Sequence, residues 1–189
     1  LTSVHLPDSV TDVEYAAFFC CQNLATVGLS SAMTVLPARM FASCTALVEA
    51  ELPAKMTRIG YGAFQHCRML TSVVIPESVT GIGEYAFDDC TALSSVTLPE
   101  NMTVIDDNTF SGCLSLRAIT IPKGVVVIGN EAFRGCSSLT EIRLPDGLKA
   151  IRDFAFSECD ALAGIMLPDS VTVLGEDVSS HVERPAPEV

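Results

Sequence analysis

Apolar residues return at fixed positions every 23 residues, and a leucine opens each copy as its position one. The eight opening leucines are Leu1, Leu24, Leu47, Leu70, Leu93, Leu116, Leu139 and Leu162. Position four is Val, Ile or Ala and position six is Leu or Ile, an alternation typical of a strand with one buried face. A fixed period of this length indicates a solenoid, in which repeats bury their apolar faces only against their neighbours.

Proline follows the strand at position seven in every copy except the second, where Ser30 stands. Proline cannot donate a ladder hydrogen bond, so we expect the strand to end there. A second apolar pair follows at positions ten and thirteen, as in Val79 and Ile82. Glycine often stands at position fourteen, where we expect it to permit a sharp bend. These glycines are Gly60, Gly83, Gly129 and Gly175.

Phenylalanine at position eighteen and cysteine at position twenty-one form two further columns. The phenylalanines are Phe18, Phe41, Phe64, Phe87, Phe110, Phe133 and Phe156. The cysteines are Cys21, Cys44, Cys67, Cys90, Cys113, Cys136 and Cys159. A spacing of three predicts one inward-facing helical or 3₁₀ turn. Each repeat is therefore predicted to be a strand, a proline corner, an extended segment, a bend and a helical turn, with each Phe ring stacked on the next.

The motif L-x-x-V/I-x-L/I-P-x-x-V-T-x-I-G-x-x-A-F-x-x-C is clearest in residues 70–90 and 116–136. It resembles the BspA-like class of leucine-rich repeat over nearly the whole chain. The resemblance implies a β-rich α/β leucine-rich-repeat solenoid of parallel stacked strands with short helical turns. It also implies a cell-surface family for which adhesion to host proteins is the usual suggestion. Because the motif is structural, the resemblance carries no functional residue.

The chain of 189 residues is 49% apolar, which suffices for one continuous core without a domain boundary. We predict one array over residues 1–175, followed by a degenerate last repeat and a proline-containing tail over 176–189. No membrane span and no signal peptide are expected within the chain. It starts on a repeat leucine without Met, so we expect a fragment whose uncapped first repeat frays or self-associates end to end.

The formal net charge is −12, from 11 basic and 23 acidic residues. Nucleic-acid binders normally carry a basic stripe, so this class is excluded, and attraction to anionic lipid is disfavoured. The charge either keeps an apolar array soluble or attracts a basic partner surface. We favour the first interpretation.

The cysteine column has three interpretations: a buried reduced ladder, disulfides or a metal site. Parallel Cβ vectors disfavour disulfides, and a spacing of 23 does not cluster thiols as zinc requires. We therefore predict buried free thiols that pack as small apolar groups. Cys20 lies outside the column, among polar residues, so we expect it to be exposed, either as an incidental thiol or as a reactive one that pairs with another chain.

No catalytic, cofactor-binding or metal site is predicted. The three histidines, His5, His66 and His181, occupy different columns, and no nucleophile accompanies them. Acidic residues gather in repeats four and five, where an ordinary solvated patch is favoured over a hard-cation site. They are Glu84, Asp88, Asp89, Asp106 and Asp107.

Positions three and five vary between repeats while the core columns stay constant, which is typical of the binding face of a repeat scaffold. The candidate protein-binding residues are Ser3, His5, Glu49, Glu51, Ser72, Val74, Ser95, Thr97, Thr120, Glu141, Arg143 and Met166. The predicted function is a non-enzymatic protein-interaction module, used for cell-surface or secreted adhesion or host-protein binding. The alternative is an intracellular structural scaffold that docks into a larger assembly.

Overall fold

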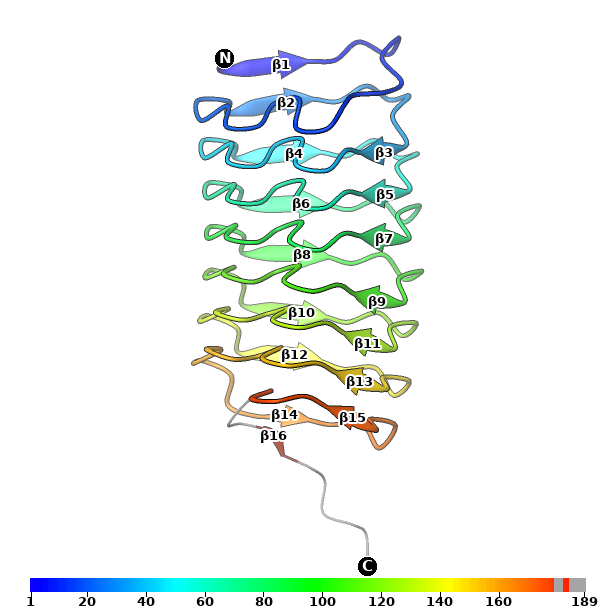
Figure 1. Ribbon diagram of the computed structural model, residues 1–189, viewed down its shortest axis with the longest axis vertical. Coiled ribbons are helices and arrows are strands. Elements are labelled where there is room, and N and C mark those ends of the chain that lie inside the picture. The colour runs from blue at the N-terminus through cyan, green and yellow to red at the C-terminus, as the bar shows by residue number, and fades with distance from the viewer. Residues whose placement is uncertain (179–181, 184–189) are drawn as a thin grey trace, which may run out of the picture.

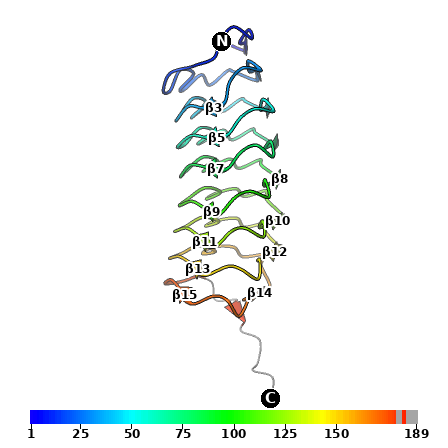
Figure 2. The same ribbon diagram turned by 90° about the vertical axis from the view of Figure 1, so that its right-hand side faces the viewer.

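The computed structural model describes residues 1–178 and the backbone of residues 182–183. The chain winds into a rod of stacked turns, with one repeat in each turn (Figure 1). Each turn contributes a strand at positions three to five and, from the second repeat onward, a shorter strand at positions twelve and thirteen. The two strand rows form opposite sides of the rod (Figure 2).

The first wall consists of the strands at positions three to five, of which the last covers only positions four and five. They are β1 Ser3–His5, β2 Thr26–Gly28, β4 Glu49–Glu51, β6 Ser72–Val74, β8 Ser95–Thr97, β10 Ala118–Thr120, β12 Glu141–Arg143 and β14 Ile165–Met166. The second wall consists of β3 Val35–Leu36, β5 Arg58–Ile59, β7 Gly81–Ile82, β9 Val104–Ile105, β11 Val127–Ile128, β13 Ala150–Ile151 and β15 Val173–Leu174. The paired strands are parallel, and residues 23 apart face each other, as with Val4 and Val27.

The first wall is hydrogen-bonded as two sheets, with the strand orders β1-β2-β4-β6-β8 and β10-β12. The second wall is also hydrogen-bonded as two sheets, with the strand orders β3-β5-β7 and β9-β11-β13-β15. At the end of the rod, β16 (Val182–Glu183) pairs with β14. Val182 lies opposite Ile165, only 17 residues earlier, so the last turn is shorter than a repeat. The predicted array boundary at residue 175 stays a prediction. The proposed tail at residues 184–189 lies outside the described residues.

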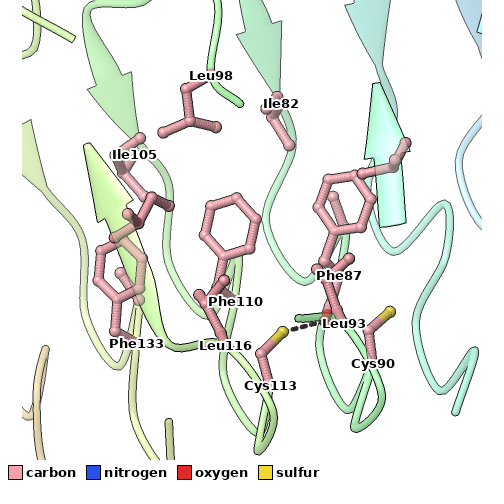
Figure 3. Packing of buried hydrophobic residues seen from close by; sticks show 14 of the residues in the cluster. Ile82, Phe87, Cys90, Leu93, Leu98, Ile105, Phe110, Cys113, Leu116 and Phe133 are labelled. Atoms are coloured by element: carbon pink, nitrogen blue, oxygen red, sulfur yellow. Dashed lines mark hydrogen bonds between the residues drawn. The ribbon is translucent and has the colours of Figure 1, made fainter. Parts of the chain in front are cut away.

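The core between the walls is a column of stacked rings, as predicted. Consecutive Phe centroids from Phe18 to Phe156 lie 5.4–5.7 Å apart, with interplanar angles of 2–17°. Figure 3 shows Phe87, Phe110 and Phe133 in this arrangement, beside Leu and Ile side chains from the walls. Each ring inside the column therefore buries its two faces against its neighbours, which a single repeat cannot do.

The predicted helical turn is wrong: within the described residues no segment is helical. The residues at positions sixteen and twenty have left-handed backbones in successive repeats, for example Tyr85 (φ 59°) and Asp89 (φ 54°). A right-handed helix cannot propagate through them. Amides at positions sixteen, eighteen and twenty instead donate to carbonyls of the next repeat, as Phe87 N–H does to Thr109 O at 2.9 Å. The segment is a pair of tight turns whose backbone bonds join successive repeats.

The glycine at position fourteen serves a different purpose from the bend we expected. Gly60 and Gly129 have no left-handed φ. A Cβ on Gly129 would lie 2.7 Å from the Asp107 amide nitrogen, and one on Gly60 would lie 2.6 Å from the Ala38 nitrogen. Glycine is therefore required here because adjacent turns approach closely, rather than because the chain bends.

Candidate protein-binding face

The strand face is the outward side of the first wall, where the structure places all twelve predicted binding residues. Each of them is exposed, and Val74 (76% exposed) and Met166 (65%) are the largest exposed apolar side chains among them. The inward residues between them, such as Val73 and Ile119, are buried. Because side chains alternate along a strand, anchoring the inward column in the core fixes the outward columns as well.

The parallel register aligns the outward residues in two rows along the rod. In the first five turns, position three carries Ser3, Thr26, Glu49, Ser72 and Ser95 in order. Position five carries His5, Gly28, Glu51, Val74 and Thr97 in the same turns. Further along, Glu141 faces Ala118 and Arg143 faces Thr120. The structure thus brings the candidate residues together as one surface rather than as a convergent pocket.

Two open hollows lie on this side of the rod. The larger, of about 560 Å³, spans β2, β4 and β6 and is lined by Glu49, Glu51 and Val74 together with Ala54 and Pro76. The smaller, of about 230 Å³, lies between β8 and β10 beside Thr97 and Thr120. Both combine strand residues with the proline corner, so a ligand could contact apolar and acidic groups together.

The charges of the strand face are few and mixed. Glu49 and Glu51 stand together at the larger hollow, whereas Arg143 donates to Glu141 at 2.9 Å. The His5 ring lies over Gly28, where a Cβ would clash with the His5 Nδ1. On such an exposed face, weak contacts with several turns are favoured, and a single strong ionic site is not.

The cysteines lie where the sequence predicted, as free thiols. The six from Cys44 to Cys159 are buried, Cys21 is half-buried and Cys20 is exposed. Each buried Sγ donates to the carbonyl oxygen of the Phe one repeat earlier, at 3.1–3.3 Å; Figure 3 shows the bond from Cys113 to Phe87. Burial raises the pKa of the Cys44 thiol to about 12. These thiols are therefore structural and poorly nucleophilic.

The acidic residues of repeats four and five are mostly engaged in joining turns. Asp107 accepts from both the backbone and the side-chain amide of Asn130, at 2.7 and 2.8 Å. Asp88 accepts from Gln65 at 3.0 Å, and Asp89 contacts His66 at 3.2 Å. Burial raises the pKa of Asp88 and Asp106. Among the described residues, no three His, Cys, Asp or Glu side chains are grouped to hold a metal ion.

One cluster on the second wall was not predicted from the sequence. It contains the three tyrosines of the chain, Tyr15, Tyr61 and Tyr85, with Arg39. The Tyr61 and Tyr85 rings lie 5.4 Å apart, and the Arg39 guanidinium lies over the Tyr61 ring at 5.5 Å. These residues stand at positions fifteen and sixteen of the first four repeats, in two different columns, and that spacing alone does not show that their side chains meet.

The family model for the BspA type leucine-rich repeat region matches the chain in six copies, over residues 1–79 and 57–182. A comparison with curated protein sequences gives no match. No helix among the residues that the structure describes is both long and apolar enough to cross a bilayer.

Solved structures of bacterial proteins share the fold. A leucine-rich repeat protein from Bacteroides ovatus is 32% identical, with a TM-score of 0.91 over 95% of this chain and 46% of its own. A leucine-rich repeat protein from T. pallidum is 30% identical, with a TM-score of 0.73 over 94% of this chain and 74% of its own. A leucine-rich cell surface protein from Faecalibacterium prausnitzii is 27% identical, with a TM-score of 0.61 over 95% of this chain and 61% of its own.

This chain thus spans about half the length of the Bacteroides ovatus protein that it resembles. Leucine-rich repeat proteins are in general non-enzymatic modules that bind protein partners. The match of the repeat model to nearly every residue, together with the stacked parallel turns, shows that the chain belongs to the BspA-type leucine-rich repeat family.

Proposed function

We propose that this chain is an adhesion module of the cell surface, or a secreted one, that binds a host protein through the strand face. The observation that carries the proposal is the contrast within the first wall. Its inward residues are uniformly apolar and at least partly buried, whereas its twelve candidate residues are varied and exposed. Variation on a rigid scaffold is how repeat proteins recognise particular partners.

The larger hollow is the proposed centre of contact. Val74, Ala54 and Pro76 supply apolar surface there, and Glu49 and Glu51 supply negative charge. A partner segment with an apolar side chain beside lysine or arginine would complement both. The cell-surface location is supported by the name of the Faecalibacterium prausnitzii relative, a leucine-rich cell surface protein.

The test is binding of the purified chain to a panel of immobilised extracellular-matrix proteins, measured by surface plasmon resonance. We expect at least one matrix protein to bind, and Val74→Asp to weaken that binding about tenfold, because it places a charge where an apolar contact forms. Val126→Asp is the matched control: Val126 is 40% exposed and immediately precedes β11 in the second wall. Equal weakening by both variants would refute the strand face as the binding surface.

A further inference from the structure

The tyrosine cluster lies on the opposite side of the rod from the strand face. Tyr61 follows β5 by two residues, and Arg39 follows β3 by three. These segments continue the second wall beyond its strands (Figure 1). The cluster is therefore separate from the face proposed above, and no residue of the larger hollow belongs to it.

The side chains of the tyrosine cluster contact one another and remain exposed to solvent. Tyr15 is 64% exposed and Tyr61 is 38% exposed. The Tyr61 phenol, and to a lesser extent that of Tyr15, raises the pKa of the Arg39 guanidinium. Stacking restricts a long arginine side chain before any partner arrives, so less conformational entropy is lost on binding.

The stretch of chain around Arg39 lacks acidic residues, and acids stand only at the borders of the cluster, where Glu14 precedes Tyr15 and Glu84 precedes Tyr85. Although the net charge is −12, residues 15–48 and 52–76 contain no Asp or Glu, and the two acids between them, Glu49 and Glu51, point outward from the strand face. Arg58 of β5 is exposed beside Val35 of β3, which is 46% exposed. Neither Arg39 nor Arg58 belongs to an ion pair within the part of the chain that the structure describes, and Arg58 has one acidic neighbour, Asp106, whose pKa is raised by burial and partly lowered by the Arg58 charge.

The second wall of the first four repeats therefore presents two unpaired guanidinium groups with exposed tyrosine rings and a valine. Tyrosine and arginine, together with tryptophan, are enriched at the energetic centres of protein interfaces. A guanidinium favours a carboxylate partner in a forked pair, and the rings favour apolar or aromatic side chains. Both requirements are met by an acidic polypeptide segment, whereas an acidic polysaccharide supplies carboxylates without the apolar side chains.

We propose that the patch formed by Tyr15, Val35, Arg39, Arg58, Tyr61 and Tyr85 is a second protein-binding site, which takes an acidic segment containing aromatic or apolar side chains. The rod then has two binding surfaces of opposite charge preference on opposite walls. If the assignment is right, this acidic protein binds an acidic ligand, and does so only at this patch.

The test measures binding of a biotinylated random copolymer of glutamate and tyrosine to the full 189-residue chain by biolayer interferometry. Polyglutamate and hyaluronan are the comparison ligands. We expect the copolymer to bind more tightly than polyglutamate, and Arg39→Gln and Tyr15→Ser each to weaken it about tenfold. Arg152→Gln, which removes an exposed arginine of the same wall away from the tyrosines, is expected to change binding by less than about twofold.

Circular dichroism and thermal unfolding of each variant separate a lost contact from a lost fold. Tyr15→Ser serves as the second variant because Tyr15 is largely exposed in the first repeat. Absence of copolymer binding would overturn the proposal, as would equal loss in Arg39→Gln and Arg152→Gln. Binding of hyaluronan in preference to the copolymer would also overturn it and identify a polysaccharide site. Val74→Asp leaves this binding unchanged if the two surfaces are separate.

Discussion

Cysteine at position twenty-one shows how a single side chain can connect one repeat to the previous one. The thiol is small enough to fit beside the Phe column, and its proton is donated to the Phe carbonyl oxygen one repeat earlier. The same carbonyl oxygen also accepts the backbone N–H of the cysteine in its own repeat, as Phe87 O does from Cys90 at 3.2 Å, so the thiol supplies its second hydrogen bond. The sequence predicted the burial from the column, but it could not give the acceptor, which depends on how the turns stack.

The buried thiols make the fold sensitive to alkaline pH. Burial raises the pKa of the Cys113 thiol well above its ordinary value. In the unfolded chain the same thiol ionises at about pH 8.5. Below about pH 8.5 the thiol is protonated in both states, so its contribution to stability is complete. Above that pH the unfolded chain loses the proton first, so the free energy of unfolding falls by up to about 1.4 kcal/mol per pH unit for each such thiol.

We therefore expect Cys113→Ala to be less stable than the wild type at pH 7.5 but to lose less stability on going to pH 10. Urea unfolding of both proteins at the two pH values measures this difference. The same dependence on pH in both would contradict the assignment of Cys113 as a buried, protonated thiol.

Among the structural elements, the two turns at positions sixteen to twenty-one depart furthest from expectation. The Phe–Cys spacing fits a helical turn, and both side chains face the core as that turn would require. The backbone is nevertheless left-handed at two positions in each of the first seven repeats, including non-glycine residues such as Glu131 and Glu158. Amides there donate to the next repeat, and this gain between repeats compensates for the local strain. A single repeat read alone does not contain that information.

The glycine at position fourteen gives a test of the close approach between turns. Gly129→Ala would place a methyl group against the backbone of Asp107, so we expect it to destabilise the protein by about 1–3 kcal/mol. Gly81→Ala is the matched control, because Gly81 lies at the start of β7 and nothing lies within 4 Å of the place that its Cβ would occupy. We expect that variant to change stability by less than about 0.5 kcal/mol. Urea unfolding compares the two, and equal costs would contradict the close-approach explanation.

Across the entire rod, the period of 23 residues was enough to predict the stacked parallel turns and the Phe column. The predicted binding residues, from Ser3 to Met166, were placed on one face by alternation along a strand. The tyrosine cluster was not predicted, because Arg39 and Tyr61 belong to different repeats and different columns. Their contact depends on the left-handed turn at Arg39 (φ 55°), which column patterns do not reveal.

The first turn also differs from the interior of the rod. Val4, Leu6, Val13, Phe18 and Cys21 are only partly buried, whereas most of the equivalent residues of central repeats lie in the core. Phe18 stacks on Phe41 of the next repeat. End-to-end association of this chain through that surface stays a prediction.

Display of the chain on the cell surface, or its release from the cell, is the part of the proposed function that most needs a direct test. An antibody raised against residues 1–178 would be used to compare labelling of intact and permeabilised source cells. We expect intact cells to be labelled, or the antigen to be recovered from the medium. Labelling that requires permeabilisation, with no antigen in the medium, would contradict the proposal and favour an intracellular scaffold.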